Sequence, residues 1–349
     1  NVVMFDNELS VAREIIDRAV EAGVHAVIAT DISAISYARS AGMEVHLSTQ
    51  VNISNTEAVR FYSEFADVMV LARELDLEQV GLISNYIKEN RIHGPSGRTV
   101  MLEMFVHGAL CMAVSGKCYM SLHEMDASAN RGECLQTCRK SYTVRNRETG
   151  YELDIDGEYI MSPKDLKTIH FLNKILVAGV SVLKIEGRAR GPEYVRTVTA
   201  CYNEAITAWC DGTYTKEKIS GWEKRLSTVF NRGFWDGYYL GQRLGEWSHR
   251  YGSRASMRKI YVGKVRNYFS RQRVAELGVE AGTLKEGEKV LIIGPTTGVV
   301  ETLAEGLRID DLPVPFAGKS TVCTFRVEQK IRRSDQVYRW VEAKQVKQQ

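Results

Sequence analysis

The stretch TVMLEMFVHG, residues 99–108, is the longest of six short apolar runs along the first 210 residues. The other five runs lie at 1–5, 25–30, 44–49, 67–72 and 181–187. Amphipathic helical patterns lie between or after them, at 7–23, 32–42, 56–66, 77–90, 163–179 and 192–210. Strands that alternate with helices are typical of parallel βαβ units. The pattern therefore predicts an α/β domain built around a parallel sheet.

Six strands are two fewer than the eight of a (β/α)₈ barrel. The first residue, Asn1, already lies in a strand-like run, which we interpret as a chain that begins inside a longer protein. We therefore predict a TIM-like (β/α)₈ barrel, N-terminally truncated, over residues 1–245. A doubly wound parallel sheet is the alternative, because six parallel strands do not exclude it.

After residue 256 the pattern changes to short strands separated by Gly, Pro and Asp turns, with no helical period between them. Such a succession is typical of small all-β barrels. The sequence predicts a second domain of this kind at 257–349, joined to the first through a linker at 246–256.

Composition narrows the class of protein. The 349 residues are 44% hydrophobic and 26% charged, which is ordinary for a globular protein. No apolar run approaches the ~18 residues of a membrane span, and no signal peptide pattern opens the chain. Seven cysteines is an odd number in a chain too large to need disulfides. We expect reduced thiols, a cytoplasmic location and no membrane contact. The net charge of +3 alone does not indicate a nucleic-acid binder.

Four cysteines fall within 28 residues, inside a predicted insertion at 108–144. They are Cys111, Cys118, Cys134 and Cys138, spaced C-x₆-C-x₁₅-C-x₃-C. Four thiolates favour zinc or an iron–sulfur cluster. Structural zinc sites usually use two tight pairs, and only the second pair is tight here, while the irregular spread suits a 4Fe–4S cluster. Both metals stay open, as does the simpler interpretation that one or two are buried small hydrophobes.

The remaining cysteines are predicted to pack in the core. Cys201 and Cys210 lie on a helical pattern, and Cys323 lies in a strand of the second domain. Cys111, by contrast, directly follows the apolar run at 99–108. Because the C-terminal ends of barrel strands form the active site, this position places the cysteine insertion at the mouth of the predicted barrel.

Charged residues inside the apolar strands are candidates for catalysis. Glu103 and His107 share one face of their strand, and Lys184 and Glu186 share one face of the last strand. Buried charges must be paired or functional. We predict these four residues to be catalytic, with His107, Glu103 or Glu186 as the groups that move protons. The structural alternative is an ion-paired interior, such as Lys184 with Glu103.

Basic residues near the strand ends are candidates for binding an anionic substrate. Arg73, Lys184 and Arg188 would suit a small anion, because guanidinium groups bind carboxylates in a bidentate manner. Arg139 and Lys140 of the cysteine insertion, with Tyr119 and Tyr142 nearby, would suit the backbone and bases of RNA. A solvated loop face is the alternative.

The motifs of this region resemble those of the collagenase-like peptidases, a family of peptidases of unknown catalytic type. The resemblance is carried by EMFVHGALCMAVSGKCYMS (103–121) and RGECLQTCRKSYTV (131–144), and extends through HLSTQVNISN, VMVLARELDLEQV, YIMSPKDL, SVLKIEGRARGPEYV and FNRGFWDGYYLG. It covers most of residues 24–245 and is strongest to the branch that hydroxylates the wobble uridine of tRNA.

The resemblance implies a barrel fold and an oxygen-independent 5-hydroxylation that uses a 4Fe–4S cluster on Cys111, Cys118, Cys134 and Cys138. It also implies prephenate as co-substrate, a dicarboxylate for which Arg73, Lys184 and Arg188 are the candidate ligands. The tRNA anticodon stem-loop would be the partner, held by the basic residues of the insertion and by the C-terminal barrel.

Three other functions stay open. Another branch of the family hydroxylates a cytidine of ribosomal RNA. A peptidase is the activity in the family name, but the sequence has no G-x-S-x-G elbow and no H-E-x-x-H helix. A cysteine nucleophile would need one thiol beside a histidine, not four thiols. The third possibility is a cluster-bearing RNA-binding protein without catalytic activity.

Overall fold

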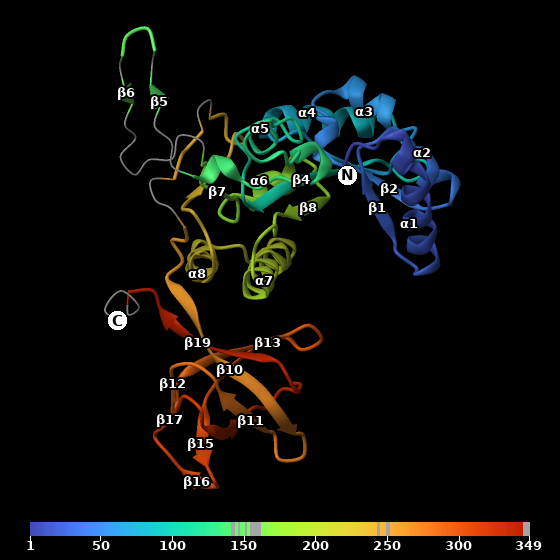
Figure 1. Cartoon of the computed structure of the whole chain (residues 1–349). Helices are drawn as coiled ribbons and strands as arrows, with labels where there is room; N and C mark the ends of the chain where they lie inside the picture. The colour runs from blue at the N-terminus through green and yellow to red at the C-terminus, as the bar shows by residue number, and fades with distance from the viewer. Residues whose placement is uncertain are drawn as a thin grey trace. The chain divides into compact units, whose positions relative to one another are not determined.

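The computed structural model describes residues 1–140, 144–145, 147–150, 152–153, 162–242, 245–248 and 252–344 (Figure 1). Tyr142 and part of the predicted linker lie outside these residues. The chain divides into two compact units. Unit 1 comprises 1–188, 205–219 and 231–252, and unit 2 comprises 189–204, 220–230 and 253–349. The domain limits drawn from the sequence stay a prediction.

Unit 1 begins with four helix–strand repeats (blue to teal in Figure 1). These are α1 (Leu9–Glu21), β1 (Ala26–Ala29), α2 (Ile32–Ser40), β2 (Glu44–Leu47), α3 (Thr56–Tyr62), β3 (Val68–Val70), α4 (Leu77–Glu89) and β4 (Met101–Gly108). The strands pair in parallel in chain order. Asp31, Asn55 and Asp76 cap the helices that follow them, each accepting a backbone N–H. The α/β alternation predicted from the sequence is confirmed here.

The strand predicted at residues 1–5 is wrong. This segment lies in no strand and leads into the 3₁₀ turn η1 (Asp6–Glu8). Its backbone is held by Val3 N–H donating to Asn130 O at 3.1 Å, so it packs on the cysteine insertion. Apolar composition alone does not make a strand when no neighbouring strand supplies a ladder of hydrogen bonds.

The cysteine insertion follows β4. It contains the short helix α5 (Met120–Met125), the 3₁₀ turns η3 (Ala129–Arg131) and η4 (Thr137–Arg139), and the hairpin strands β5 (Val144–Arg145) and β6 (Glu152–Leu153). A further 3₁₀ turn, η2 (Thr49–Val51), follows β2.

The helix predicted at 163–179 is only partly correct. Its first part is the strand β7 (Asp165–Lys167), and only α6 (Leu172–Val177) is helical. β7 pairs antiparallel with β4 and parallel with β9 (Phe234–Trp235). Asp165 is fully buried in β7, with Arg232 at 3.4 Å. This tertiary pairing overrides the local helical period.

β8 (Val182–Ile185) pairs in parallel with β4, so the sheet of unit 1 has the order β1-β2-β3-β4-β7-β9 with β8 also on β4. The mixed α/β class is therefore confirmed. Among the described strands no pairing closes this sheet into a ring, and the eight-stranded barrel stays a prediction. The long helix α7 (Pro192–Cys210) matches the predicted bounds and is followed by α8 (Lys216–Thr228).

Residues 257–342 of unit 2 contain only β structure among the assigned elements (orange to red in Figure 1). The strands are β10 (Met257–Phe269), β11 (Val274–Val279), β12 (Thr283–Lys285), β13 (Lys289–Gly294), β14 (Gly298–Leu303), β15 (Glu305–Ile309), β16 (Leu312–Pro313), β17 (Phe316–Gly318), β18 (Val322–Arg326) and β19 (Gln336–Glu342). Eight of them form one sheet of order β14-β13-β19-β10-β11-β18-β15-β16. Inward residues such as Leu277, Ile292 and Phe325 form its apolar core.

Cys201 and Cys323 are buried, as predicted. Cys210 is exposed, so the prediction of core packing is wrong there. It is the last residue of α7, where the chain leaves the helix toward Gly212. No helix in the described part of the chain is both long enough and apolar enough to cross a bilayer.

Candidate active site

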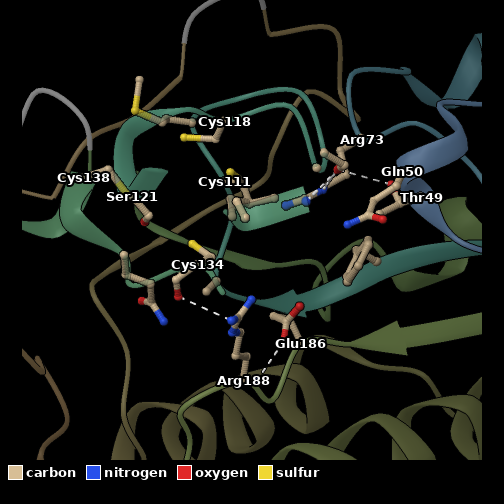
Figure 2. Close-up of a pocket in the computed structure, with 18 of the residues that line it drawn as sticks. Thr49, Gln50, Arg73, Cys111, Cys118, Ser121, Cys134, Cys138, Glu186 and Arg188 are labelled. Atoms are coloured by element: carbon tan, nitrogen blue, oxygen red, sulfur yellow. Dashed lines mark hydrogen bonds between the residues drawn. The ribbon is translucent and has the colours of Figure 1, made fainter. Parts of the chain in front are cut away.

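All four cysteines of the insertion line one cavity of about 310 Å³ in unit 1 (Figure 2). Cys111 follows β4, Cys118 precedes α5, Cys134 lies between η3 and η4, and Cys138 lies in η4. The rest of the wall comes from residues at or just after the C-terminal ends of strands, including Gln50 after β2, Arg73 after β3 and Glu186 after β8. The cavity thus lies where parallel strands of α/β proteins bring functional side chains together.

Arg73 and Lys184 are the two cations beside the aromatic ring of Phe105. The Arg73 guanidinium lies 5.0 Å from the ring centroid, and the Lys184 ammonium lies 5.8 Å from it. Arg73 also donates from Nε and Nη2 to Ser115 Oγ, at 3.1 and 2.7 Å. Lys184 Nζ lies 2.8 Å from Glu103 Oε1. Both cations line the cavity; Arg73 is held by Ser115 of the same wall, and Lys184 is held by Glu103, which does not line it.

Arg139 and Arg188 also line the cavity, and both donate hydrogen bonds to backbone carbonyls. Arg139 donates to Leu110 O at 2.6 Å, to Pro163 O at 2.8 Å and to Ser162 Oγ at 2.9 Å. Arg188 donates to Gly132 O at 2.8 Å and to Cys134 O at 3.3 Å. The two arginines predicted to bind substrate therefore hold the segments that carry Cys111 and Cys134.

Polar contacts also fix the loop between the first two cysteines. Thr49 Oγ1 lies 3.5 Å from Ser115 Oγ. Gly116 has a φ of +77°, and a Cβ at this position would lie 2.9 Å from Gln50 Cγ. Glycine is therefore required for η2 to approach the loop. Farther along, Leu135 N–H donates to Ser121 Oγ at 3.0 Å.

Glu103 and His107, both predicted to be catalytic, do not line the cavity. Their relative exposures are 4% and 1%, and they lie within β4. Glu103 forms the ion pair with Lys184 that the sequence offered as the structural alternative. Its second oxygen, Oε2, has no hydrogen-bond partner, and His46 Nδ1 lies 4.0 Å away. The ring of His107 contacts Phe234, with centroids 5.6 Å apart.

The other predicted residues divide between the cavity and the surface. Glu186 lines the cavity, and its Oε1 accepts a hydrogen bond from the backbone N–H of Arg188 at 2.7 Å. Lys140 does not line it. The Lys140 side chain is 57% exposed and lies 3.3 Å from Glu124. Tyr119 is 75% exposed.

Sequence reasoning missed several polar residues of the cavity wall, notably Thr49, Ser115 and Gln136. A signal for Ser115 exists in the sequence. The Ser–Gly pair lies midway between the first two cysteines, where a tight loop needs a residue that tolerates positive φ. No comparable signal marks Gln136.

The thiols influence one another electrostatically. Burial raises the pKa of Cys138, the positive charge of Arg139 opposes that rise, and the nearby thiols of Cys111, Cys134 and Cys118 add to it. A positively charged iron or zinc centre would reverse the balance, because metal-bound thiols lose their proton.

The four thiols are the donor set that a metal centre in this cavity would use. Among the described residues, no three His, Cys, Asp or Glu side chains converge closely enough to hold a single metal ion. The four thiols line one hollow from separate segments. This donor set suits an iron–sulfur cluster, and four thiolates are also a ligand set of structural zinc sites.

The composition of the wall limits the chemistry that the cavity can support. Its described residues include four cysteines, four cations and one carboxylate, that of Glu186, but no histidine and no aspartate. Thiol-based hydrolysis needs a base beside the nucleophile, usually histidine. The wall is better equipped to bind an anion beside a thiolate-ligated centre.

Comparison with known proteins places these features in a family. The model of Peptidase family U32 matches residues 1–249. A protein of Porphyromonas gingivalis named Collagenase is 58% identical over 340 residues, which cover 97% of this chain and 82% of that protein. The tRNA hydroxylation protein P1 of Bacillus subtilis is 30% identical over 329 residues, covering 90% and 74%. The 23S rRNA 5-hydroxycytidine C2501 synthase of Escherichia coli is 36% identical over 256 residues, covering 70% and 36%.

The family thus includes enzymes named for RNA hydroxylation as well as proteins named as proteases. The match covers the whole sheet of unit 1 and the complete cysteine insertion. This chain belongs to Peptidase family U32.

Proposed function

We propose that this chain hydroxylates a pyrimidine of RNA at C5, and that its substrate is the wobble uridine of tRNA. The main support for this proposal is that four thiols from separate segments line a single cavity together with cations, and that no histidine is among the described residues of its wall. Two relatives at 30% and 36% identity are named for hydroxylation of tRNA and of ribosomal RNA. They support the reaction class.

The four thiols would hold a 4Fe–4S cluster, which supplies one-electron redox chemistry when bound. The residues of the chain then have separate tasks. Arg139 and Arg188 hold the cysteine segments through their carbonyls. Ser115 and Gly116 keep the loop of the first two cysteines against η2.

The co-substrate in this proposal is prephenate, a dicarboxylate. Ser115 occupies only the Nε and Nη2 donors of Arg73, so the remaining donors can bind a carboxylate. Lys184 adds a second positive charge on the same wall. A cavity of about 310 Å³ lies at the lower end of the range for small-molecule sites.

The target base would enter the cavity unstacked, as bases do in enzymes that modify them. Replacing C5–H by C5–OH inserts one oxygen atom and removes two electrons from the base, so in this proposal the co-substrate gives up an oxygen atom and is reduced by two electrons. The C5 proton needs an acceptor that carries it to the new oxygen. Glu186 is the only carboxylate on the described part of the wall, and we assign it this role. Glu103 acts behind the wall by holding Lys184 in place.

A peptidase is the second candidate, favoured by the 58% identity to a protein named Collagenase. In this case one cysteine would act as nucleophile. A peptidase of this chain would cleave gelatin without bound iron and lose that activity to a thiol alkylator. A hydroxylase would contain iron and leave gelatin intact.

The test is nucleoside mass spectrometry of tRNA from a bacterial host that lacks its own wobble-uridine hydroxylases. Expression of the native chain should restore 5-hydroxyuridine, and Cys111→Ser should not. If the RNA is unmodified although the native chain carries its full iron content, the proposed reaction is wrong. A chain that binds tRNA without any modification would be the non-catalytic binding protein.

A further inference from the structure

Positive charge is concentrated in the C-terminal part of the sequence. Residues 253–349 contain 18 Lys and Arg against 11 Asp and Glu, a net charge of +7. Residues 1–252 contain 28 against 32, a net charge of −4, so the overall charge of +3 conceals a strong asymmetry. A basic domain attached to an acidic one indicates a polyanionic partner for the basic domain.

One face of the sheet in unit 2 points away from its core. Residues that are paired across neighbouring strands place their side chains on the same face. Phe269 of β10 pairs with Val274 of β11, which pairs with Arg326 of β18. In the next row Asn267 pairs with Glu276, and Glu276 with Thr324. The alternate residues, such as Ala275, are buried in the core.

Two hollows lie on this face, which we call the β10–β11–β18 face. One is lined by Val265, Arg266, Asn267, Glu276, Arg333 and Ser334. The other is lined by Phe269, Gln272, Val274, Glu305, Gly306, Arg308, Asp311, Thr324, Phe325 and Arg326. Backbone hydrogen bonds from Ser334 N–H to Val265 O and from Val265 N–H to Asp335 O hold the turn that carries Arg333 beside β10.

Arg266 and Arg333 are available to bind a ligand, because both are exposed in the same hollow and neither is ion-paired within the described part of the chain. Gly278 positions Arg266. A Cβ at residue 278 would lie 2.7 Å from Arg266 Nε, so only glycine lets this side chain lie across β11. Arg326, another cation of the face, is already engaged, since its Nε lies 3.1 Å from Glu328 Oε1.

The second hollow supplies an aromatic surface. Phe269 is 40% exposed at the end of β10, beside Arg308 and Gln272. Exposed aromatic rings next to arginines are the usual means by which proteins stack on nucleic-acid bases. Glu276, Glu305 and Asp311 also line the two hollows, so the face does not present a uniform positive field.

We propose that the β10–β11–β18 face is an RNA-binding site, in which Arg266 and Arg333 contact phosphates and Phe269 stacks on an unpaired base. The inference rests on the proposed function, since it assumes that the substrate is an RNA. It adds a second site of contact, separate from the cysteine cavity in its residues. Binding by phosphate contacts depends strongly on salt and little on sequence.

The test measures the affinity of the full chain for an unmodified tRNA transcript over a range of salt concentrations. Arg266→Gln/Arg333→Gln is compared with Lys285→Gln/Lys289→Gln, which removes the same charge from residues that line neither hollow. The first pair should lower affinity on the order of tenfold or more at ~0.1 M salt and reduce the salt slope by about 2. The second pair should have a much smaller effect. Phe269→Ala should lower affinity on the order of tenfold with no change in slope.

The outcomes separate this inference from the proposed function. If Arg266→Gln/Arg333→Gln binds tRNA with native affinity and slope, or if both pairs weaken binding equally, the face is not the site, while the hydroxylation assay stands on its own. If the native chain binds gelatin but not RNA, and Arg266→Gln/Arg333→Gln no longer binds gelatin, the face binds peptide and the RNA assignment is overturned.

Discussion

Two regions of this molecule are lined by arginines, and they use them differently. In the cysteine cavity Arg139 and Arg188 donate to backbone carbonyls of the segments that carry the thiols. On the β10–β11–β18 face Arg266 and Arg333 are exposed and have no ion-pair partner within the described residues. Arg139 and Arg188 therefore build the first site, whereas Arg266 and Arg333 are available to a ligand.

The difference shows what decides the role of a cation. A guanidinium surrounded by backbone carbonyls satisfies buried acceptors, and removing it leaves those acceptors without partners. An exposed guanidinium on a sheet loses little when it is replaced, because water already solvates it. Stability and ligand binding should therefore respond oppositely to substitutions in the two regions.

The largest effect is expected for Arg139→Gln. Loss of its hydrogen bonds to Leu110 O, Pro163 O and Ser162 should destabilise unit 1 by about 2–3 kcal/mol and abolish hydroxylation. The neighbour Lys140, which is exposed and paired with Glu124, is the matched control, and Lys140→Gln should cost about 0–1 kcal/mol. Urea unfolding followed by circular dichroism measures both. Equal losses of unfolding free energy in Arg139→Gln and Lys140→Gln would contradict the structural role of Arg139.

The pair Glu103–Lys184 tests whether an ion pair behind the wall is structural or catalytic. Glu103→Leu should cost about 2 kcal/mol, less than the full penalty for breaking a buried pair, because the Lys184 side chain that loses its partner is 22% exposed. The double variant Glu103→Leu/Lys184→Met should recover most of that stability. It should not recover hydroxylation, because Lys184 lines the cavity. Recovery of both would show that Lys184 serves only the fold.

Gly278→Ala tests whether the position of Arg266 on the β10–β11–β18 face matters for binding. The new methyl group would displace Arg266 without changing any charge. We expect native stability to within about 1 kcal/mol and a severalfold loss of affinity for tRNA, measured by fluorescence anisotropy. Gly318→Ala is the control, because a Cβ there meets no atom within 4 Å. Unchanged tRNA affinity in Gly278→Ala would mean that the position of Arg266 is irrelevant.

The smallest effect concerns the contact between the N-terminal segment and the cysteine insertion. Hydrogen bonds from Arg131 and from the Phe5 backbone N–H lower the pKa of Glu8 to about 2, below its usual 4.5. A lowered folded-state pKa stabilises above the unfolded value, and this stabilisation is lost as pH falls from 4.5 toward 2. Glu8→Gln should therefore lower the melting temperature at neutral pH, and the difference from the native chain should shrink below pH 4.5. A pH-independent difference would exclude this pair as its cause.

Much of unit 1 could be predicted from hydrophobic periodicity, because its first helices and strands are local in sequence. The failures have a tertiary cause. Asp165 lies in a strand only because β4 and β9 flank it, and the segment at 1–5 has no strand beside it. Whether β strands close into a barrel depends on pairings that no local pattern contains.

The candidate site divides in the same way. The position of the four cysteines at one cavity could be predicted from the sequence. The strand that precedes their insertion ends at the edge of the sheet where the other parallel strands also end. The roles of Glu103 and Arg139 could not be predicted in this way. Both are charged residues near apolar strands. Glu103 forms an ion pair with Lys184 behind the wall, whereas Arg139 donates hydrogen bonds to backbone carbonyls. That choice depends on which acceptors the fold brings within reach.

The central claim is that the four cysteines hold an iron–sulfur cluster. The direct measurement is quantification of iron and acid-labile sulfide in the anaerobically purified chain, with its visible and EPR spectra. The account predicts about four iron and four sulfide per chain, with the broad absorption near ~400 nm of thiolate-ligated iron, and loss of both in Cys111→Ser. One zinc per chain, or no metal with retained activity, would contradict it.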